Sequence, residues 1–200
     1  MIILIATKNI DKFNTTKGIF QRLGLIKYEY KNLRDYQLLD ENEEVGTMKE
    51  RARDKVEFAM KSLRDNKDFE NMFLVVGIDD GFYIPSKDLL TANSKEMVDE
   101  ILSGNFITIG DVVEEVRSYS IYSVADDKYY YYESRLPLRF LGNENGIKRK
   151  EGINPLKNVL SFEIESQPIG SHSQEEIDEV ILGYVREDFS RIIKLVTQRI

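Results

Sequence analysis

Strands and helices alternate in the first eighty residues, and this alternation limits most strongly how the chain can fold. Residues 2–6 and 72–79 are almost continuously apolar, as expected of strands buried on both faces of a sheet. Residues 10–23 and 47–64 carry apolar side chains at helical spacing, and residues 27–30 favour a further strand. This order predicts an α/β fold, with a mixed central sheet flanked by helices.

The second half of the chain has a different pattern. Apolar and polar residues alternate from 114 to 141 on either side of the short polar turn 125–128, which predicts a β-hairpin. Residues 142–155 favour a loop, and residues 173–200 favour a long amphipathic helix. No Pro- or Ser-rich linker divides the sequence, so we expect one domain, residues 1–200, in which any two lobes are interleaved.

Composition excludes several classes of function. The net charge of −7 argues against non-specific binding to nucleic acid or to an anionic membrane, although a local basic cluster can still hold a small anion. The chain has no cysteine and one histidine, so a metal would be held mainly by oxygen ligands, which favours Mg²⁺, with Mn²⁺ as the alternative. The apolar start is too short for a signal peptide or a membrane span, and we expect a cytoplasmic protein.

The first candidate site is the stretch ATKNIDK, where the first strand passes into the first helix. Free N–H groups and the helix dipole favour an anion at such a junction. The hydroxyl of Thr7, the amide of Asn9 and the ammonium of Lys12 are groups that can hold phosphate oxygens, and Lys8 lies among them. The competing interpretation is a helix cap formed by Asn9 or Asp11.

The second candidate is acidic. Asp79 and Asp80 come at the expected end of the central apolar strand, where α/β sheets place ligands. A carboxylate from the acidic loop that precedes Gly46, such as Glu44, could join them to hold one Mg²⁺. The competing interpretations are a solvated acidic loop and a simple turn at Gly81.

The third candidate surrounds the only histidine, His172. Ser171 or Ser173 could cap the final helix, and Glu176 would complete a capping box with Ser173. In a functional role, His172 could donate a hydrogen bond to a phosphate or to a purine carbonyl.

Taken in order, these stretches resemble the inosine triphosphate pyrophosphatase family (Ham1-like non-canonical purine NTP pyrophosphatases). The family's Thr/Ser-x-Asn-x-x-Lys motif matches Thr7, Asn9 and Lys12. Its Glu-x-Gly segment and the helix that follows match residues 44–55, EVGTMKERARDK, where Arg51 stands in the place of an Asn.

The later motifs also follow the family order, with departures. GIDDGF resembles the family's Asp-Asp-Ser-Gly motif, with Asp79 at the catalytic Asp and Asp80 at the Ser/Thr position. GINP resembles Gly-Tyr-Asp-Pro with Asn154 replacing the Asp, and SHS resembles Ser-His-Arg with Ser173 replacing the Arg.

The resemblance covers nearly the whole chain, and it implies two interleaved lobes with a cleft between them and a homodimer. It also implies the reaction NTP + H₂O → NMP + pyrophosphate with Mg²⁺. The implied roles are a metal- and water-binding pair, a triphosphate-binding set and a purine-facing set. The metal- and water-binding pair is Glu44 and Asp79, with Asp80 as a further candidate ligand. The triphosphate-binding set is Thr7, Lys8, Asn9, Lys12 and Lys55, and the purine-facing set is Ser171 and His172. Asn154 is a further substrate-binding candidate.

Two other functions stay open. The replaced motif residues Arg51, Asn154 and Ser173 favour a weakened relative that binds a nucleotide, or another phosphorylated ligand, without efficient hydrolysis. The acidic loop and the tyrosines of residues 129–132 would suit a protein-interaction scaffold.

Overall fold

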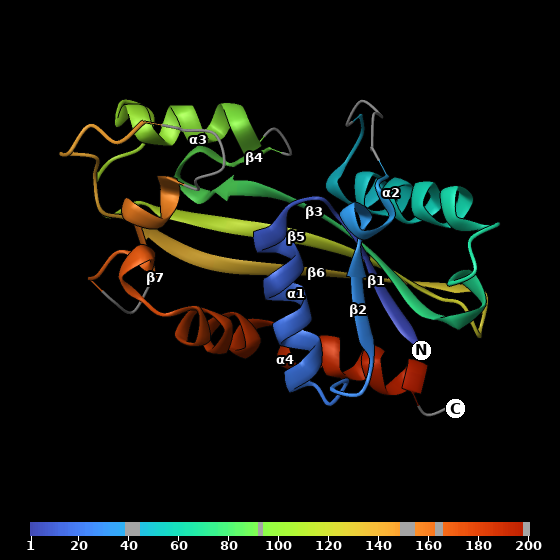
Figure 1. Ribbon diagram of the computed structural model, residues 1–200. Helices are drawn as coiled ribbons and strands as arrows, with labels where there is room; N and C mark the ends of the chain where they lie inside the picture. The colour runs from blue at the N-terminus through green and yellow to red at the C-terminus, as the bar shows by residue number, and fades with distance from the viewer. Residues whose placement is uncertain (39–44, 92–93, 149–154, 163–165, 198–200) are drawn as a thin grey trace. The chain divides into compact units, whose positions relative to one another are not determined.

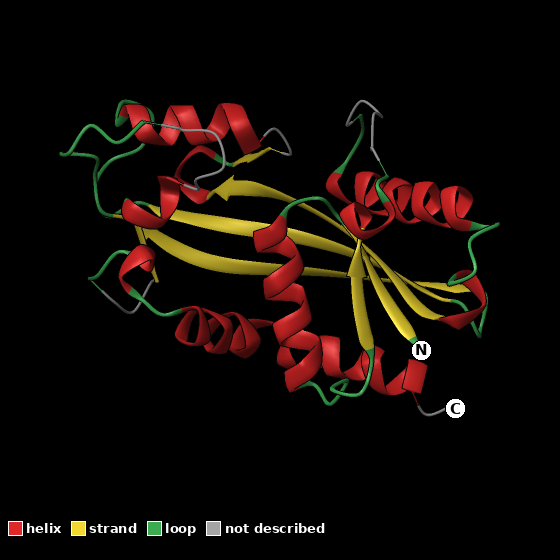
Figure 2. Ribbon diagram, viewed as in Figure 1, coloured by secondary structure: helices red, strands yellow, loops and turns green. Residues whose placement is uncertain are grey.

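The structure is a computed structural model of the 200-residue chain, and it describes residues 1–38, 45–91, 94–148, 155–162 and 166–197. Within these ranges the chain forms one mixed sheet and four α-helices (Figures 1 and 2). The strands are β1 (Ile2–Ala6), β2 (Glu29–Asn32), β3 (Met72–Ile84), β4 (Leu89–Thr91), β5 (Val112–Ser123), β6 (Lys128–Phe140) and β7 (Leu160–Phe162). The helices are α1 (Ile10–Arg22), α2 (Met48–Leu63), α3 (Ser94–Ser103) and α4 (Gln174–Thr197), and short 3₁₀ turns lie at Leu33–Tyr36, Phe69–Asn71, Pro85–Lys87, Pro155–Asn158 and Ile169–Ser171.

The sheet order of the described strands is β2-β1-β3-β5-β6-β7, with β4 paired to β3. β1 runs parallel to both β2 and β3, whereas β4 and β7 are antiparallel to their neighbours. The sequence prediction of an α/β fold with a mixed sheet is therefore confirmed. Because α1 leads to β2 on one side of β1 and α2 leads to β3 on the other, right-handed crossovers place the two helices on opposite faces of the sheet.

The chain divides into two compact units whose segments alternate along the sequence. Unit 1 consists of Met1–Asp79, Arg117–Ser134 and Val185–Ile200, and unit 2 consists of Asp80–Val116 and Arg135–Tyr184. Each unit is described by itself below.

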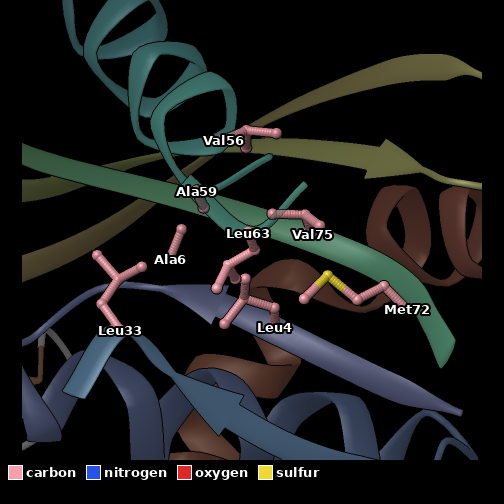
Figure 3. Close-up of a cluster of buried hydrophobic side chains, with 8 residues drawn as sticks. All are labelled: Leu4, Ala6, Leu33, Val56, Ala59, Leu63, Met72 and Val75. Atoms are coloured by element: carbon pink, nitrogen blue, oxygen red, sulfur yellow. The ribbon is translucent and has the colours of Figure 1, made fainter. Parts of the chain in front are cut away.

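A core of aliphatic side chains holds α2 against β1 and β3 in unit 1 (Figure 3). Alternation along β1 turns Leu4 and Ala6 to one face, where they meet the buried stripe of α2. The members of this core are Leu4, Ala6, Leu33, Val56, Ala59, Leu63, Met72 and Val75. Gly77 lets the helix approach closely, because a Cβ atom there would overlap the carbonyl oxygen of Ala52.

The end of the central strand differs from the prediction. A strand that stops at Asp79 and Asp80, or a turn at Gly81, is wrong, because β3 continues to Ile84. Its last three residues pair with β4, and the buried Phe82 and Ile84 give this extension its own apolar side. Parallel pairing with β1 nevertheless ends at Gly77, so the edge where β1 stops lies just before Asp79.

Candidate functional site

The junction between β1 and α1 is a structured helix cap. The side chain of Asn9 accepts hydrogen bonds from the N–H groups of Asp11 at 2.9 Å and Lys12 at 3.2 Å. The hydroxyl of the buried Thr7 accepts the N–H of Asn9 at 3.1 Å. Asn9, rather than Asp11, is therefore the cap. Its carbonyl oxygen serves the helix, so its amide nitrogen is the part of this side chain suited to a phosphate oxygen.

Asp79 forms an ion pair with α2. Its Oδ1 accepts a 2.6 Å hydrogen bond from Nζ of Lys55, which also donates to the carbonyl oxygen of Ile78 at 3.2 Å. The side chain of Asp79 is only 4% exposed. A second cation lies nearby, since Nη1 of Arg51 is 4.0 Å from Oδ2 of Asp79. The structure therefore brings together Lys55 and Asp79, two of the residues predicted for the site.

Thr7 and Asp79 lie at the same edge of the sheet. Ala6 and Gly77 are paired neighbours on parallel strands, and Thr7 and Asp79 follow them by one and two residues. β1 leads to β2 on one side, and β3 lies on its other side, so this edge is the point where the direction of winding reverses. In open α/β sheets, ligands bind at this reversal, beyond the carboxyl ends of the strands.

The start of α2 lies near Asp79, through the side chain of Arg51. Gly46 has φ +94°, a left-handed conformation, and an added Cβ would lie 2.8 Å from Oε2 of Glu50. Thr47 and Glu50 form a capping box, and hydrogen bonds from the backbone and then the hydroxyl of Thr47 hold the pKa of Glu50 below its ordinary value. Nε of Arg51 donates to the carbonyl oxygen of Gly46 at 3.1 Å. Arg51 thus contributes a guanidinium that contacts this turn and lies near Asp79.

Sequence reasoning noted Arg51 as a departure from a motif but did not place it in the site. The helical spacing of Arg51 and Lys55, four residues apart, put both on one face of α2 and was the available signal.

Several predicted residues fall outside this group. Asp80 follows Asp79 on β3, and alternation along a strand turns successive side chains to opposite faces. A shared role of Asp80 and Asp79 as ligands of one metal ion stays a prediction. Glu44 and Asn154 lie outside the described residues, so their predicted roles stay predictions.

Ser171 and His172 belong to unit 2 and lie together before α4. The exposed Ser171 donates its hydroxyl to the carbonyl oxygen of Pro168 at 2.7 Å, and the ring of His172 packs 5.5 Å from that of Phe162. Their predicted contact with a purine stays a prediction.

The expected capping box at the start of the last helix is confirmed. Ser173 donates its N–H to Glu176 at 2.7 Å, and the N–H of Glu176 donates to the Ser173 hydroxyl at 3.3 Å. The Ser173 N–H is the main cause of a lowered pKa of Glu176. Ser173 thus has a local structural role.

The donor chemistry of unit 1 suits a hard cation only in part. Asp79 is the kind of ligand that Mg²⁺ prefers, but its carboxylate already contacts Lys55. Among the described residues no group of three or more His, Asp or Glu side chains is placed to hold a metal ion. A Mg²⁺ ion here would share Asp79 with Lys55 and would take a further ligand from another residue, for which Glu44 remains the prediction.

Fold and site define the class of this protein as α/β, with a polar, cation-rich edge at the point where the winding of its parallel strands reverses. No protein-family model and no curated protein matches the chain. None of the described helices is long and apolar enough to cross a membrane.

Proposed function

We propose that the protein is a nucleoside triphosphate pyrophosphatase that hydrolyses purine NTPs, non-canonical ones by resemblance, to NMP and pyrophosphate. One observation carries the proposal. Two cations of α2, Lys55 and Arg51, converge on Asp79 at the sheet edge that also bears Thr7 and the start of α1. A polyanion needs neutralising cations, and water attack on it needs a carboxylate that orients the nucleophile.

In this proposal one set of residues binds the triphosphate and another activates the attacking water. Lys12 and Lys55 bind the triphosphate, with Lys8, Thr7 and the amide nitrogen of Asn9 as further donors. Asp79, together with Glu44, accepts a proton from the water that attacks the α-phosphorus. The bond between that phosphorus and the bridging oxygen breaks, and pyrophosphate leaves. A Mg²⁺ ion bound by Asp79 and Glu44 would neutralise charge on the phosphates.

The finer features of the resemblance belong to the same proposal. The resemblance implies two interleaved lobes with a cleft between them. Ser171 and His172 would face the purine, Asn154 would be a further substrate-binding residue, and the protein would act as a cytoplasmic homodimer. The relation to the inosine triphosphate pyrophosphatase family stays a proposal supported by the ordered motifs and by the Asp79–Lys55 pair.

One observation favours a second candidate, a protein that binds a phosphorylated ligand without efficient hydrolysis. Asp79 is 3% exposed and held by Lys55 at 2.6 Å, so a catalytic role requires the carboxylate to leave part of this contact. A binder would keep the ion pair intact.

Pyrophosphate release separates the two candidates. The purified protein is incubated with Mg²⁺ and a panel of canonical and deaminated NTPs, beside the variants Asp79→Asn and Lys12→Ala. The enzyme proposal expects release that falls by about two to three orders of magnitude in Asp79→Asn. The control is Asp54→Asn, the same chemical change at an exposed position of α2. Nucleotide-induced thermal stabilisation with no release from the wild type would contradict the enzyme and support the binder.

A further inference from the structure

Asn145 and Gly146 form the only Asn–Gly pair of the sequence, and they lie in the turn that follows β6. Both residues are exposed. The N–H of Gly146 donates to the carbonyl oxygen of Asn143 at 3.0 Å and closes the turn. Gly146 has φ +58°, and no atom beyond its chain neighbours lies within 4 Å of the position that a Cβ atom would take. No side chain therefore covers the amide nitrogen of Gly146 from this direction.

The two asparagines of this turn have different surroundings. The side chain of Asn143 donates from Nδ2 to the carbonyl oxygens of Leu102 at 2.8 Å and Ile147 at 2.9 Å, and its Oδ1 accepts the N–H of Ile147 at 2.7 Å. These bonds hold the Asn143 amide in place and tie the turn to the end of α3. The exposed side chain of Asn145 makes no hydrogen bond within the part of the chain that the structure describes. Its amide can therefore rotate toward the amide nitrogen of Gly146.

We propose that Asn145 is a site of spontaneous deamidation, with water as the only other reactant. The amide nitrogen of Gly146 attacks Cγ of Asn145, a C–N bond forms, and Nδ2 leaves as ammonia with the proton that the attacking nitrogen releases. Water then opens the cyclic imide, and the nitrogen regains a proton. Attack of water at Cγ restores the normal backbone with an aspartate, whereas attack at the main-chain carbonyl of residue 145 gives an isoaspartate.

The turn offers little resistance to this reaction. Attack requires the hydrogen bond between Gly146 and Asn143 to open, and exposed turns with few buried contacts open at low free-energy cost. A residue with a side chain after the asparagine would crowd the attacking nitrogen, whereas glycine leaves it accessible. Asn143, in contrast, precedes Glu144 and would first have to break the hydrogen bonds of its own amide.

An isoaspartate would change the contacts of the turn. The backbone would then pass through Cγ of residue 145 and gain a methylene group between Asn143 and Ile147. These two residues are joined by a pair of hydrogen bonds, which depends on the present length of the intervening backbone. Isoaspartate should therefore weaken this pair and the link to Leu102, whereas a normal aspartate should keep both.

The test is a time course of the full-length protein in mildly alkaline buffer, followed by tryptic digestion and mass spectrometry. Cleavage after Arg139 and Lys148 releases residues 140–148, a peptide that contains both asparagines. We expect loss of the amide form of this peptide and the appearance of two acidic isomers, in which fragmentation places the change at Asn145. Asn143 is the internal control and should keep its amide. A synthetic peptide of the same residues gives the rate in an unfolded chain.

Two variants separate the parts of the proposal. Gly146→Ala keeps the asparagine but crowds the attacking nitrogen, so it should lose most of the conversion. Asn145→Asp has the charge of the product on a normal backbone. We expect the amide of Ile147 to exchange its hydrogen as slowly in Asn145→Asp as in the wild type, and faster in the isolated isoaspartate fraction. Thermal melts confirm that each variant is folded.

Three results would overturn the proposal. They are retention of the amide in the folded protein after the synthetic peptide has converted, equal conversion of Asn143 and Asn145, and equal conversion of the wild type and Gly146→Ala. Equal hydrogen exchange in the isoaspartate fraction and the wild type would overturn the proposed consequence for the turn. None of these outcomes depends on pyrophosphate release, so the proposed function stands or fails separately.

Discussion

At the scale of single residues, the buried carboxylate of Asp79 depends most strongly on its ion-pair partner. The side chain of Asp79 is 4% exposed to solvent, and the ammonium of Lys55 replaces part of the hydration that the carboxylate loses. Such a pair contributes little net stability compared with two apolar residues, but loss of one partner leaves a buried charge without compensation. The pair therefore fixes the position of the carboxylate, which is what a reactive group at this edge requires.

Replacing Lys55 alone tests this dependence. Lys55→Met keeps the length of the side chain and removes its charge, and we expect the free energy of unfolding to fall by about 3 kcal/mol. In the double variant Lys55→Met/Asp79→Asn most of that loss should be recovered, because the unpaired charge is gone. Urea denaturation of the four proteins in the cycle measures the coupling. Additive losses would show that the two side chains do not depend on each other.

At the scale of elements, the contact between α2 and β3 positions the ion pair. Gly77 allows the helix to lie directly on the strand, and the capping box at Thr47 and Glu50 fixes where the helix begins. Lys55 is two turns further on, so its reach to Asp79 follows from the depth at which the helix packs and from its starting point.

Gly77→Ala should push α2 away from the sheet. The new methyl group would overlap the carbonyl oxygen of Ala52, and backbone cannot move aside as a flexible side chain can. We expect a loss of at least about 3 kcal/mol in unfolding free energy, at the upper end of overpacking effects. Gly183→Ala is the control, because space around this glycine of α4 is open, and there alanine should stabilise by about 0.5–1 kcal/mol. A tolerated Gly77→Ala would contradict this close packing.

The capping box makes α2 sensitive to acid. The folded state holds the pKa of Glu50 below the ordinary value of 4.5, so the ionised carboxylate stabilises the fold above that pH. As the pH falls through the lowered pKa, the carboxylate is protonated and this stabilisation is lost. Glu50→Gln should therefore melt below the wild type at pH 7, and the two melting temperatures should converge as the pH drops well below 4.5. A constant difference between them across this range would rule out the charge as its cause.

At the scale of the whole molecule, the most important feature is that the first helix, α1, and the last helix, α4, both contribute to the core of unit 1. Phe189 of α4 packs against Phe20 of α1 at 5.2 Å between ring centroids. It also meets Tyr119 of β5 at 4.9 Å and Tyr132 of β6 at 5.2 Å. Unit 1 therefore cannot complete its aromatic core until the last helix is present.

Truncation of Phe189 tests this closure. Phe189→Ala should lower the free energy of unfolding by about 3–5 kcal/mol, because a fully buried ring is lost and a cavity remains. Phe189→Leu keeps most of the volume and should cost much less. A chain that ends at residue 184 should lose cooperative unfolding, monitored by near-ultraviolet circular dichroism through the tyrosines of this cluster. Cooperative melting of that shortened chain would contradict the proposed closure.

The sequence by itself determined the local features, which depend on residues only a few positions apart. The apolar run of residues 2–6, the hairpin turn near 125–128 and the Ser173–Glu176 capping box were predicted and are present, because hydrogen bonds and side-chain periodicity over two to four residues define them. For the start of α1 the sequence left Asn9 and Asp11 as alternative caps, and the structure shows that Asn9 is the cap.

Only the tertiary structure decided the relations between distant positions. It showed that β3 runs past Asp79 to Ile84, that β1 lies between β2 and β3, and that Arg51 joins Lys55 beside Asp79. These features depend on which strands pair and on how closely a helix packs over them. Many side chains far apart in the chain set that packing together, so no single short stretch of sequence encodes it.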